Sequence, residues 1–162
     1  ETAAGITRRF WPDWPGWPLL DAGITWPDEA LEREVYRFYI FEPRQKGMYG
    51  GFWSTLRCDD IRDQRVADRL LLFAVVAGAS VAAKTLQRVL SDFTPLAVDG
   101  VIGPKTITAV TTYGPHIDIV SALERAEVDH YFGIVLRELQ RDASSATQWR
   151  NLPGWINRSR LA

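Results

Sequence analysis

Thiols and imidazoles are scarce in this sequence. Its 162 residues include a single cysteine, Cys58, and two histidines, His116 and His130. One thiol excludes an internal disulfide and any site built from several thiolates, and two histidines alone make a poor set of zinc ligands. We therefore expect no metal and no other cofactor. Cys58 could be imagined to pair with a histidine, but no local motif surrounds these residues, so an inert cysteine is the favoured interpretation.

An excess of one charge and a long apolar run are missing as well. The formal net charge is −1, whereas proteins that bind nucleic acid carry a basic surface for the phosphates. The longest apolar stretch, residues 70–77 with a weaker continuation over 81–83, is shorter than the roughly 20 residues of a membrane span. The first residue is Glu1 rather than methionine, and no signal peptide is visible after it, so we expect an N-terminus that is truncated, processed or unobserved. We expect neither a nucleic-acid partner nor a membrane span.

Aromatic residues and prolines, in contrast, crowd the first 27 residues. This segment contains four Trp-Pro pairs: Trp11-Pro12, Trp14-Pro15, Trp17-Pro18 and Trp26-Pro27. Each proline disfavours helical angles in the residue before it. The pattern predicts an irregular, extended N-terminal arm. Its tryptophans could stack on the faces of sugar rings or cover the surface of helices, and we favour the second role for the arm.

Helical periodicity begins after the arm. Asp28 and Glu29 suit the positive end of a helix, and apolar residues then recur at helical spacing. We expect further helices over about 60–77, 81–90, 104–113 and 117–141, and a long loop rich in glycine and aromatic residues over 43–53. Residues 70–77 are apolar on every side, which is typical of a central helix surrounded by others. No segment alternates as a strand would, so the predicted fold is all-α.

Several stretches, in order along the chain, resemble one protein family. The opening Thr2-Ala3-Ala4-Gly5-Ile6-Thr7 is similar to the T-x-x-G-I-T of the family 108 glycoside hydrolases, the secretion-activator-like lysozymes. Residues 57–61 and 73–78 resemble the lead-in and the central helix of that family. Residues 86–90 and 98–106 resemble its C-terminal peptidoglycan-binding segment, and residues 154–158 its terminal G-W-x-N-R.

The resemblance implies an all-α, lysozyme-like domain with the irregular arm at its N-terminus. Residues 1–90 would be a catalytic-type portion that lacks its N-terminal segment, and residues 91–162 a peptidoglycan-binding segment packed into the same globule. The implied activity is that of an endolysin-like, bacteriolytic muramidase. Such an enzyme cleaves the β-1,4 bond between N-acetylmuramic acid and N-acetylglucosamine in the glycan strands of the bacterial cell wall or periplasm. A bacterial, phage or prophage origin stays open.

The catalytic residues are incomplete in this chain. Hydrolysis of a glycosidic bond requires a general acid, usually with a second carboxylate. The resemblance places that acid in an E-G-G-Y motif upstream of Glu1, and the chain contains no such motif. Glu1 lies at the wrong spacing and is expected to be a solvated carboxylate. Thr2 matches a threonine that holds the attacking water, although a threonine in a turn is an equal alternative. We therefore expect this chain to be inactive by itself.

Candidate substrate contacts are Thr7, Trp11, Tyr49 and Trp53. Thr7 belongs to the T-x-x-G-I-T motif, where a scaffold role is the alternative. Trp53 lies in the glycine-rich loop and could line a cleft, with Tyr49 as a weaker companion.

The sequence also departs from the family pattern. Leu72 and Val76 stand where the central helix of the family commonly has Asp and Asn. If these positions face a cleft, the replacements weaken its polar lining; if they are buried supports, only the core becomes drier. Asp99, Gly100 and Thr106 carry a peptidoglycan-binding resemblance, but a turn followed by a helix start explains them locally. Two other functions stay open: a non-catalytic peptidoglycan-binding or structural module, and a helical interaction domain without a role in sugar binding.

Overall fold

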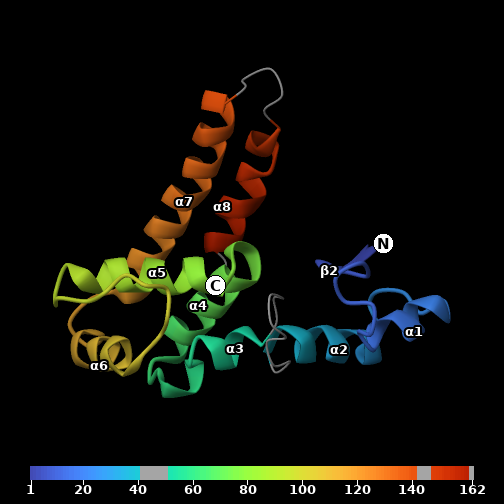
Figure 1. Cartoon of the computed structure of the whole chain (residues 1–162), viewed down its shortest axis with the longest axis horizontal. Coiled ribbons are helices and arrows are strands. Elements are labelled where there is room, and N and C mark those ends of the chain that lie inside the picture. The colour runs from blue at the N-terminus through green and yellow to red at the C-terminus, as the bar shows by residue number, and fades with distance from the viewer. Residues whose placement is uncertain (41–50, 142–146, 161–162) are drawn as a thin grey trace. The chain divides into compact units, whose positions relative to one another are not determined.

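The computed structural model describes residues 1–40, 51–141 and 147–160, and within them the regular secondary structure is helical apart from one short hairpin (Figure 1). This confirms the predicted all-α class. The strands are β1 (Thr2–Ala3) and β2 (Ile6–Thr7). The helices are α1 (Gly16–Asp21), α2 (Glu29–Ile40), α3 (Phe52–Thr55), α4 (Gln64–Ala77), α5 (Ala79–Ser91), α6 (Pro104–Tyr113), α7 (Ile119–Arg141) and α8 (Leu152–Arg160), with 3-10 turns η1 (Cys58–Asp60) and η2 (Gln148–Arg150).

The chain divides into two compact units, which we call the N-terminal unit (Glu1–Ser54) and the C-terminal unit (Thr55–Ala162). The boundary predicted after residue 90 divides a catalytic-type portion from a peptidoglycan-binding segment and is not the boundary between the two compact units. It stays a prediction. The packing of both portions into one lysozyme-like globule also stays a prediction. No helix among the described residues is long and apolar enough to cross a membrane.

In the N-terminal unit, α2 provides the surface on which the first 27 residues fold. Asp28 caps the helix, because its carboxylate accepts hydrogen bonds from the backbone N–H groups of Ala30 (2.9 Å) and Leu31 (3.0 Å). Leu31 and Phe38 lie one heptad apart and are both buried. The helix therefore presents an apolar face to the arm.

The Trp-Pro arm folds onto that face and is not extended as predicted. Trp14 and Trp17 are buried with Ile6, Leu31 and Phe38 in one core cluster. The Trp14 indole N–H donates to the backbone oxygen of Glu34 (3.2 Å), which joins the arm to α2. The helix-covering role is confirmed for these two tryptophans. The extended arm was the wrong expectation because broad indole rings gain more from burial than from exposure, and because Pro18 is tolerated in the first turn of α1.

In the C-terminal unit, α4 and α5 pack against each other and meet at a single residue. Gly78 has φ 90° and ψ 148°, and it is both the last cap of α4 and the first cap of α5. A side chain at this φ would be strained, so glycine permits the sharp change of direction. The prediction that the central helix ends at Gly78 is confirmed.

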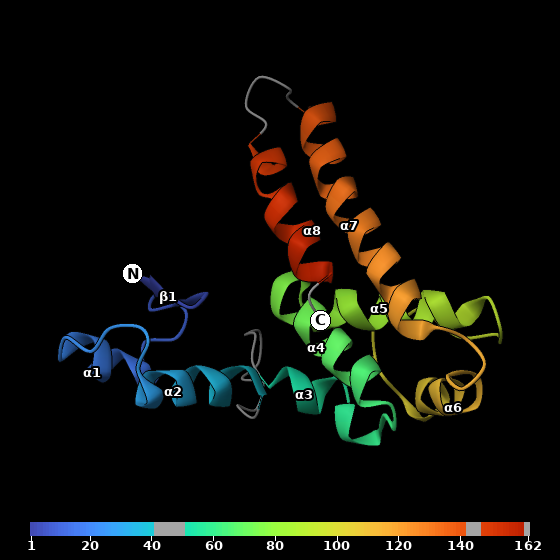
Figure 2. The same ribbon diagram turned by 180° about the vertical axis from the view of Figure 1, so that it is seen from behind.

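Helices α6, α7 and α8 complete the C-terminal unit. Pro104 opens α6, as predicted, where its missing N–H has no cost. Both views show α7 and α8 side by side (Figures 1 and 2), and the rings of Tyr131 and Trp155 join them with centroids 5.3 Å apart. Leu123, Tyr131 and Val135 supply the buried side of α7.

One expectation about α4 is wrong: its apolar C-terminal half is not surrounded. Leu70, Phe73 and Ala74 are buried, but Leu72 is 49% exposed and Val76 is 42% exposed. Helix α4 packs against α5 and α7, so its remaining face keeps apolar side chains in contact with solvent. Apolar composition on every side therefore did not guarantee a partner on every side.

A buried ion pair joins α4 to α7. Arg69 is 1% exposed and Glu127 is 3% exposed. Arg69 Nε lies 3.2 Å from Glu127 Oε1, and an Arg69 terminal nitrogen lies 3.4 Å from Glu124 Oε1. Burial raises the pKa of the Glu127 carboxyl to about 7, with the Glu124 charge acting in the same direction and the Arg69 charge opposing both.

The raised pKa predicts a pH-dependent stability for the C-terminal unit. The Glu127 carboxyl has a reference pKa of 4.5 when exposed, so its folded form holds the proton more tightly than its unfolded form. Its contribution to stability is complete below about pH 4.5 and is lost as the pH rises to about 7. Glu127→Gln should flatten this part of the pH dependence, which we estimate as on the order of 1–3 kcal/mol.

The measurement is the free energy of unfolding from hydrogen exchange of amides in α4 and α7 between pH 5 and pH 8. Only the slope is compared, because Glu127→Gln also alters the pairing of Arg69. Asp129→Asn, at an exposed position of α7, is the matched control and should keep the wild-type slope. Equal slopes in Glu127→Gln and the wild type would contradict the assignment.

Candidate functional site

The T-x-x-G-I-T motif forms a tight hairpin in the N-terminal unit. Thr2 pairs with Thr7 and Ala3 with Ile6, and both residues of the connecting turn have positive φ, 47° at Ala4 and 81° at Gly5. This combination is typical of the two-residue turns that match the twist of a hairpin. The Tyr39 hydroxyl of α2 donates to the Ala4 backbone oxygen at 2.7 Å. The turn is therefore fixed on α2.

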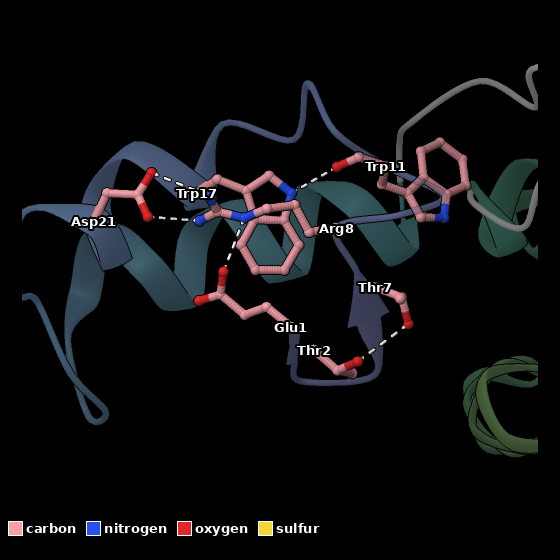
Figure 3. A network of polar contacts seen from close by, with 7 residues as sticks. All are labelled: Glu1, Thr2, Thr7, Arg8, Trp11, Trp17 and Asp21. Carbon is pink, nitrogen blue, oxygen red and sulfur yellow. Dashed lines mark hydrogen bonds and ion pairs between the residues drawn. The ribbon is translucent and has the colours of Figure 1, made fainter.

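The hairpin brings the two candidate threonines together (Figure 3). The hydroxyl oxygens of Thr2 and Thr7 are 3.3 Å apart, a distance at which one donates to the other. Thr2 is exposed and Thr7 is half-buried. Each hydroxyl retains further capacity to donate or accept, so the pair could hold a water molecule between fixed oxygens.

An arginine links the hairpin to α1 (Figure 3). Arg8 Nε lies 2.9 Å from the Glu1 carboxylate and an Arg8 terminal nitrogen lies 2.6 Å from the Asp21 carboxylate. Its guanidinium also lies 4.6 Å from the centre of the Trp17 ring. The hydrogen bond to Asp21 raises the pKa of Arg8 despite the opposing effect of burial. Glu1 thus acts as a counter-charge, and its carboxylate is exposed as expected.

The remaining sugar-binding candidates differ in their placement. Trp11 is half-buried, and its backbone N–H donates to the Thr7 oxygen at 3.0 Å, so these two candidates share one turn. The edge of the Trp11 ring meets Phe38 with centroids 4.6 Å apart. Trp53 is half-buried on α3, which replaces the last part of the predicted loop. Tyr49 lies outside the described residues.

The segment around Asp99 is a clamped turn. Buried Gln87 donates to the Asp99 carboxylate (2.8 Å) and to the Val101 oxygen (3.0 Å), and it accepts from the Gly100 N–H (2.8 Å). A Cβ at Gly100, where φ is 84°, would lie 2.6 Å from Ser80 Oγ. Thr106 is buried in the first turn of α6. Each residue of the motif thus has a local structural role, as we expected.

A groove of about 440 Å³ runs along one side of α6, and we call it the α6 groove. Three threonine hydroxyls, a lysine and an aromatic ring contribute to its lining. The Tyr113 ring lies 6.1 Å from that of Phe93 and is tilted by 32°. The lining residues are Thr94, Pro95, Leu96, Pro104, Lys105, Thr108, Ala109, Thr112 and Tyr113.

A larger hollow of about 570 Å³ lies where the beginnings of α4 and α7 meet the end of α6, and we call it the α4–α7 hollow. It combines apolar side chains with two arginines, two aspartates and a histidine. The lining residues are Arg62, Asp63, Arg65, Val66, Val110, Thr111, Gly114, Pro115, His116, Ile117, Asp118, Ile119 and Val120.

The next feature is the arrangement of the metal-ligating side chains and of the single thiol. In residues 1–40, 51–141 and 147–160, no three histidine, cysteine, aspartate or glutamate side chains are grouped as metal ligands would be. Cys58 is buried, and its thiol lies 3.8 Å from the Ala67 backbone oxygen. Burial raises the pKa of this thiol to about 12, with the charges of Asp59 and Asp68 adding to the effect. The thiol is therefore a poor nucleophile.

The helices that carry the groove and the clamped turn have a recognisable sequence. Residues 81–160 match the model of a family described as a predicted peptidoglycan domain. This peptidoglycan-domain segment extends from α5 to α8 and contains the 98–106 and 154–158 motifs. It supports peptidoglycan as the partner and the cell wall as the place of action. It begins ten residues before the predicted position 91. No curated protein matches the chain.

No pattern along the chain points to the groove or the hollow. Arg62 and His116 lie 54 positions apart, in the segments just before α4 and just after α6, and no local pattern predicts that these segments line one hollow. A weak signal existed in Asp63 and Asp118, each of which stands directly before a helical segment, as N-caps do. Such caps mark where helices begin, but they do not show which beginnings meet.

The hairpin geometry predicts an unusual cost for Gly5→Ala. The new Cβ would sit at a positive φ and would lie 2.7 Å from the Tyr39 hydroxyl, so the hydrogen bond to Ala4 would be displaced. Gly23→Ala is the matched control, because Gly23 has φ 83° and a Cβ added there would have no neighbouring atom within 4 Å. We expect Gly5→Ala to lower the free energy of unfolding by about 1 kcal/mol more than Gly23→Ala.

The measurement is urea unfolding followed by tryptophan fluorescence. A Tyr39→Phe background removes the hydroxyl and should bring the two costs together. Equal costs in the wild-type background would show that the Tyr39 contact does not hold the turn.

Proposed function

We propose that the C-terminal unit binds the glycan strand of peptidoglycan in the α6 groove. The observation that carries this proposal is the position of the groove: all of its lining residues belong to the segment that matches the peptidoglycan domain. Its hydroxyl groups can donate to and accept from the hydroxyl and acetamido groups of sugars. The ring of Tyr113 beside Phe93 offers an aromatic surface for the apolar face of a sugar ring.

The groove suits binding rather than hydrolysis. Among the described residues that line it, none is an aspartate or glutamate, whereas cleavage of a glycosidic bond usually requires a pair of carboxyl groups. The buried Glu127 has a raised pKa, but it is paired with Arg69 and lines neither the groove nor the hollow. The C-terminal unit therefore anchors the protein to its polymer.

Binding should depend on the exposed threonines of α6. Thr108→Val together with Thr112→Val keeps the side-chain shape but removes two hydroxyl groups from the groove. At about 1 kcal/mol per lost hydrogen bond, affinity for purified sacculi should fall by roughly tenfold or more. Thr25→Val, at an exposed position of the N-terminal unit, is the matched control.

Co-sedimentation with sacculi gives the affinity, and circular dichroism shows whether the variants stay folded. A folded double variant that binds as tightly as the wild type would remove the groove from the proposal. Failure of the wild type itself to bind sacculi would reject the proposed function.

We further propose that the N-terminal unit is the water-holding part of a muramidase site. The supporting observation is the pair of hydroxyls at Thr2 and Thr7, 3.3 Å apart on a turn that Tyr39 fixes. In this proposal Thr2 orients the attacking water with Thr7 beside it, and Trp11, Trp53 and Tyr49 contact the sugars. The general acid comes from an E-G-G-Y segment that precedes Glu1, and the β-1,4 bond after N-acetylmuramic acid is cleaved.

The test uses the chain extended by the sequence that its own gene encodes before Glu1. If that sequence holds E-G-G-Y, the extended chain should release reducing ends from sacculi, whereas the 162 residues alone should not. General acid catalysis contributes about 10²–10⁴-fold, so Glu→Gln in the motif should lower the rate by that order.

Thr2→Val should lower kcat with little effect on binding, and Thr25→Val should not. Lysis by the 162 residues alone, with the mass of the preparation verified, would contradict the assignment of the acid.

A further inference from the structure

Among the described residues, some charged side chains of the α4–α7 hollow are hydrogen-bonded to neighbouring residues, and others are not. Asp63 is the N-cap of α4: its carboxylate accepts from the Arg65 backbone N–H (3.0 Å), from Arg65 Nε (3.1 Å) and from an Arg65 terminal nitrogen (2.8 Å). The hydrogen bond from the Arg65 side chain is the main reason that the pKa of Asp63 is lowered. Asp63 and Arg65 therefore form a closed pair.

Asp118 is engaged in the same way at the start of α7. Its carboxylate accepts from the Ser121 backbone N–H at 3.1 Å and from the Ser121 hydroxyl at 2.7 Å. The hydroxyl bond is the main reason that the pKa of Asp118 is lowered. Both helix beginnings are thus capped by an aspartate of the chain itself, which occupies the position where an external anion would approach the helix start.

Arg62 differs from these residues. It lines the hollow and is exposed, and within the part of the chain that the structure describes no residue forms a hydrogen bond or ion pair with its guanidinium. His116 lines the same hollow and is also exposed. Apart from the Asp63–Arg65 pair and the capped Asp118, the polar side chains of the lining are the Arg62 guanidinium, the His116 imidazole and the Thr111 hydroxyl. All three can donate hydrogen bonds to an anionic ligand.

The rest of the lining restricts which anion fits. Apolar side chains of Val66, Val110, Ile117, Ile119 and Val120 form much of the wall. Inorganic phosphate would leave that wall in water, whereas a short peptide would cover it with its own apolar side chains. A volume of about 570 Å³ also exceeds what a simple ion requires and lies in the range of small-ligand sites.

We propose that the α4–α7 hollow binds a carboxylate-bearing peptide, the chemistry of the peptide stems of peptidoglycan, with Arg62 holding the carboxylate. A guanidinium can bind both carboxylate oxygens through two parallel hydrogen bonds. The inference rests on the proposed function, since the polymer that presents the glycan strand also presents the peptide. Helix α6 forms a wall of both the groove and the hollow, so one strand can supply ligands to both.

The experiment measures binding of three probes to the whole chain by calorimetry. The probes are N-acetylmuramoyl-L-alanyl-D-glutamic acid, the same compound with both carboxylates converted to amides, and chitotetraose as a neutral glycan. Arg62→Gln should lower the affinity for the acidic muropeptide on the order of tenfold or more. The amide should bind the wild type as weakly as the acid binds Arg62→Gln. Arg88→Gln, at an exposed position of α5 outside the hollow, is the matched control.

Two results overturn the inference: Arg62→Gln binds the acidic muropeptide as tightly as the wild type, or the amide binds as tightly as the acid. Inorganic phosphate that competes fully with the muropeptide would also overturn it, by showing a plain anion site. Sacculus binding separates the two proposals. If the wild type and Arg62→Gln bind sacculi equally and neither binds the acid more tightly than the amide, only the proposed peptide site is rejected. If the wild type does not bind sacculi, the proposed function is rejected.

Discussion

The C-terminal unit depends on the buried contact between Arg69 of α4 and Glu127 of α7. Removing two charged side chains from water is expensive, and because the pKa of Glu127 stays raised, the nearby Arg69 charge offsets only part of that cost. An arrangement that separated the two side chains would lose even that part. The pair therefore favours one arrangement of α4 against α7 over nearby alternatives. The walls of the α4–α7 hollow come from the beginnings of these same two helices. The ion pair and the capped helix starts together keep those walls in place.

Helix α6 lines both candidate binding surfaces of the C-terminal unit, one with each of its sides. Threonines at 108 and 112 line the groove, whereas Val110, Thr111 and Gly114 line the hollow. The turn that leads into α6 is held by Gln87, a fully buried amide whose donors and acceptor bind Asp99, Gly100 and Val101. The Asp99–Val101 part of the motif that carries the peptidoglycan resemblance thus holds the turn that leads into α6, whereas its Pro104 and Lys105 line the groove.

The helices could be predicted from the sequence because their signals are local. Asp28, Gly78 and Pro104 mark helix boundaries through hydrogen-bonding capacity or backbone angles that no neighbour changes. The arm is not extended because a proline restricts only its own φ and the residue before it. The rings of Trp14 and Trp17 gain from a core that forms with residues 31 and 38. Leu72 and Val76 show the same limit, since exposure depends on which helices pack where. The hollow requires α4, α6 and α7 to meet, and the groove requires residues 94–96 to lie against α6. No spacing along the chain encodes either arrangement.

The single-residue junction at Gly78 also limits where the chain can be lengthened or recombined without disrupting the packing of α4 and α5. With one residue serving both helices, there is no loop in which an inserted residue would be absorbed, so length changes at this junction should be rare among descendants of the gene. The segment that matches the peptidoglycan domain begins at residue 81, inside α5. A recombination at that point would divide a helix and leave its buried face without Leu70 and Phe73 of α4. The compact unit is therefore larger than the matched segment and includes α4.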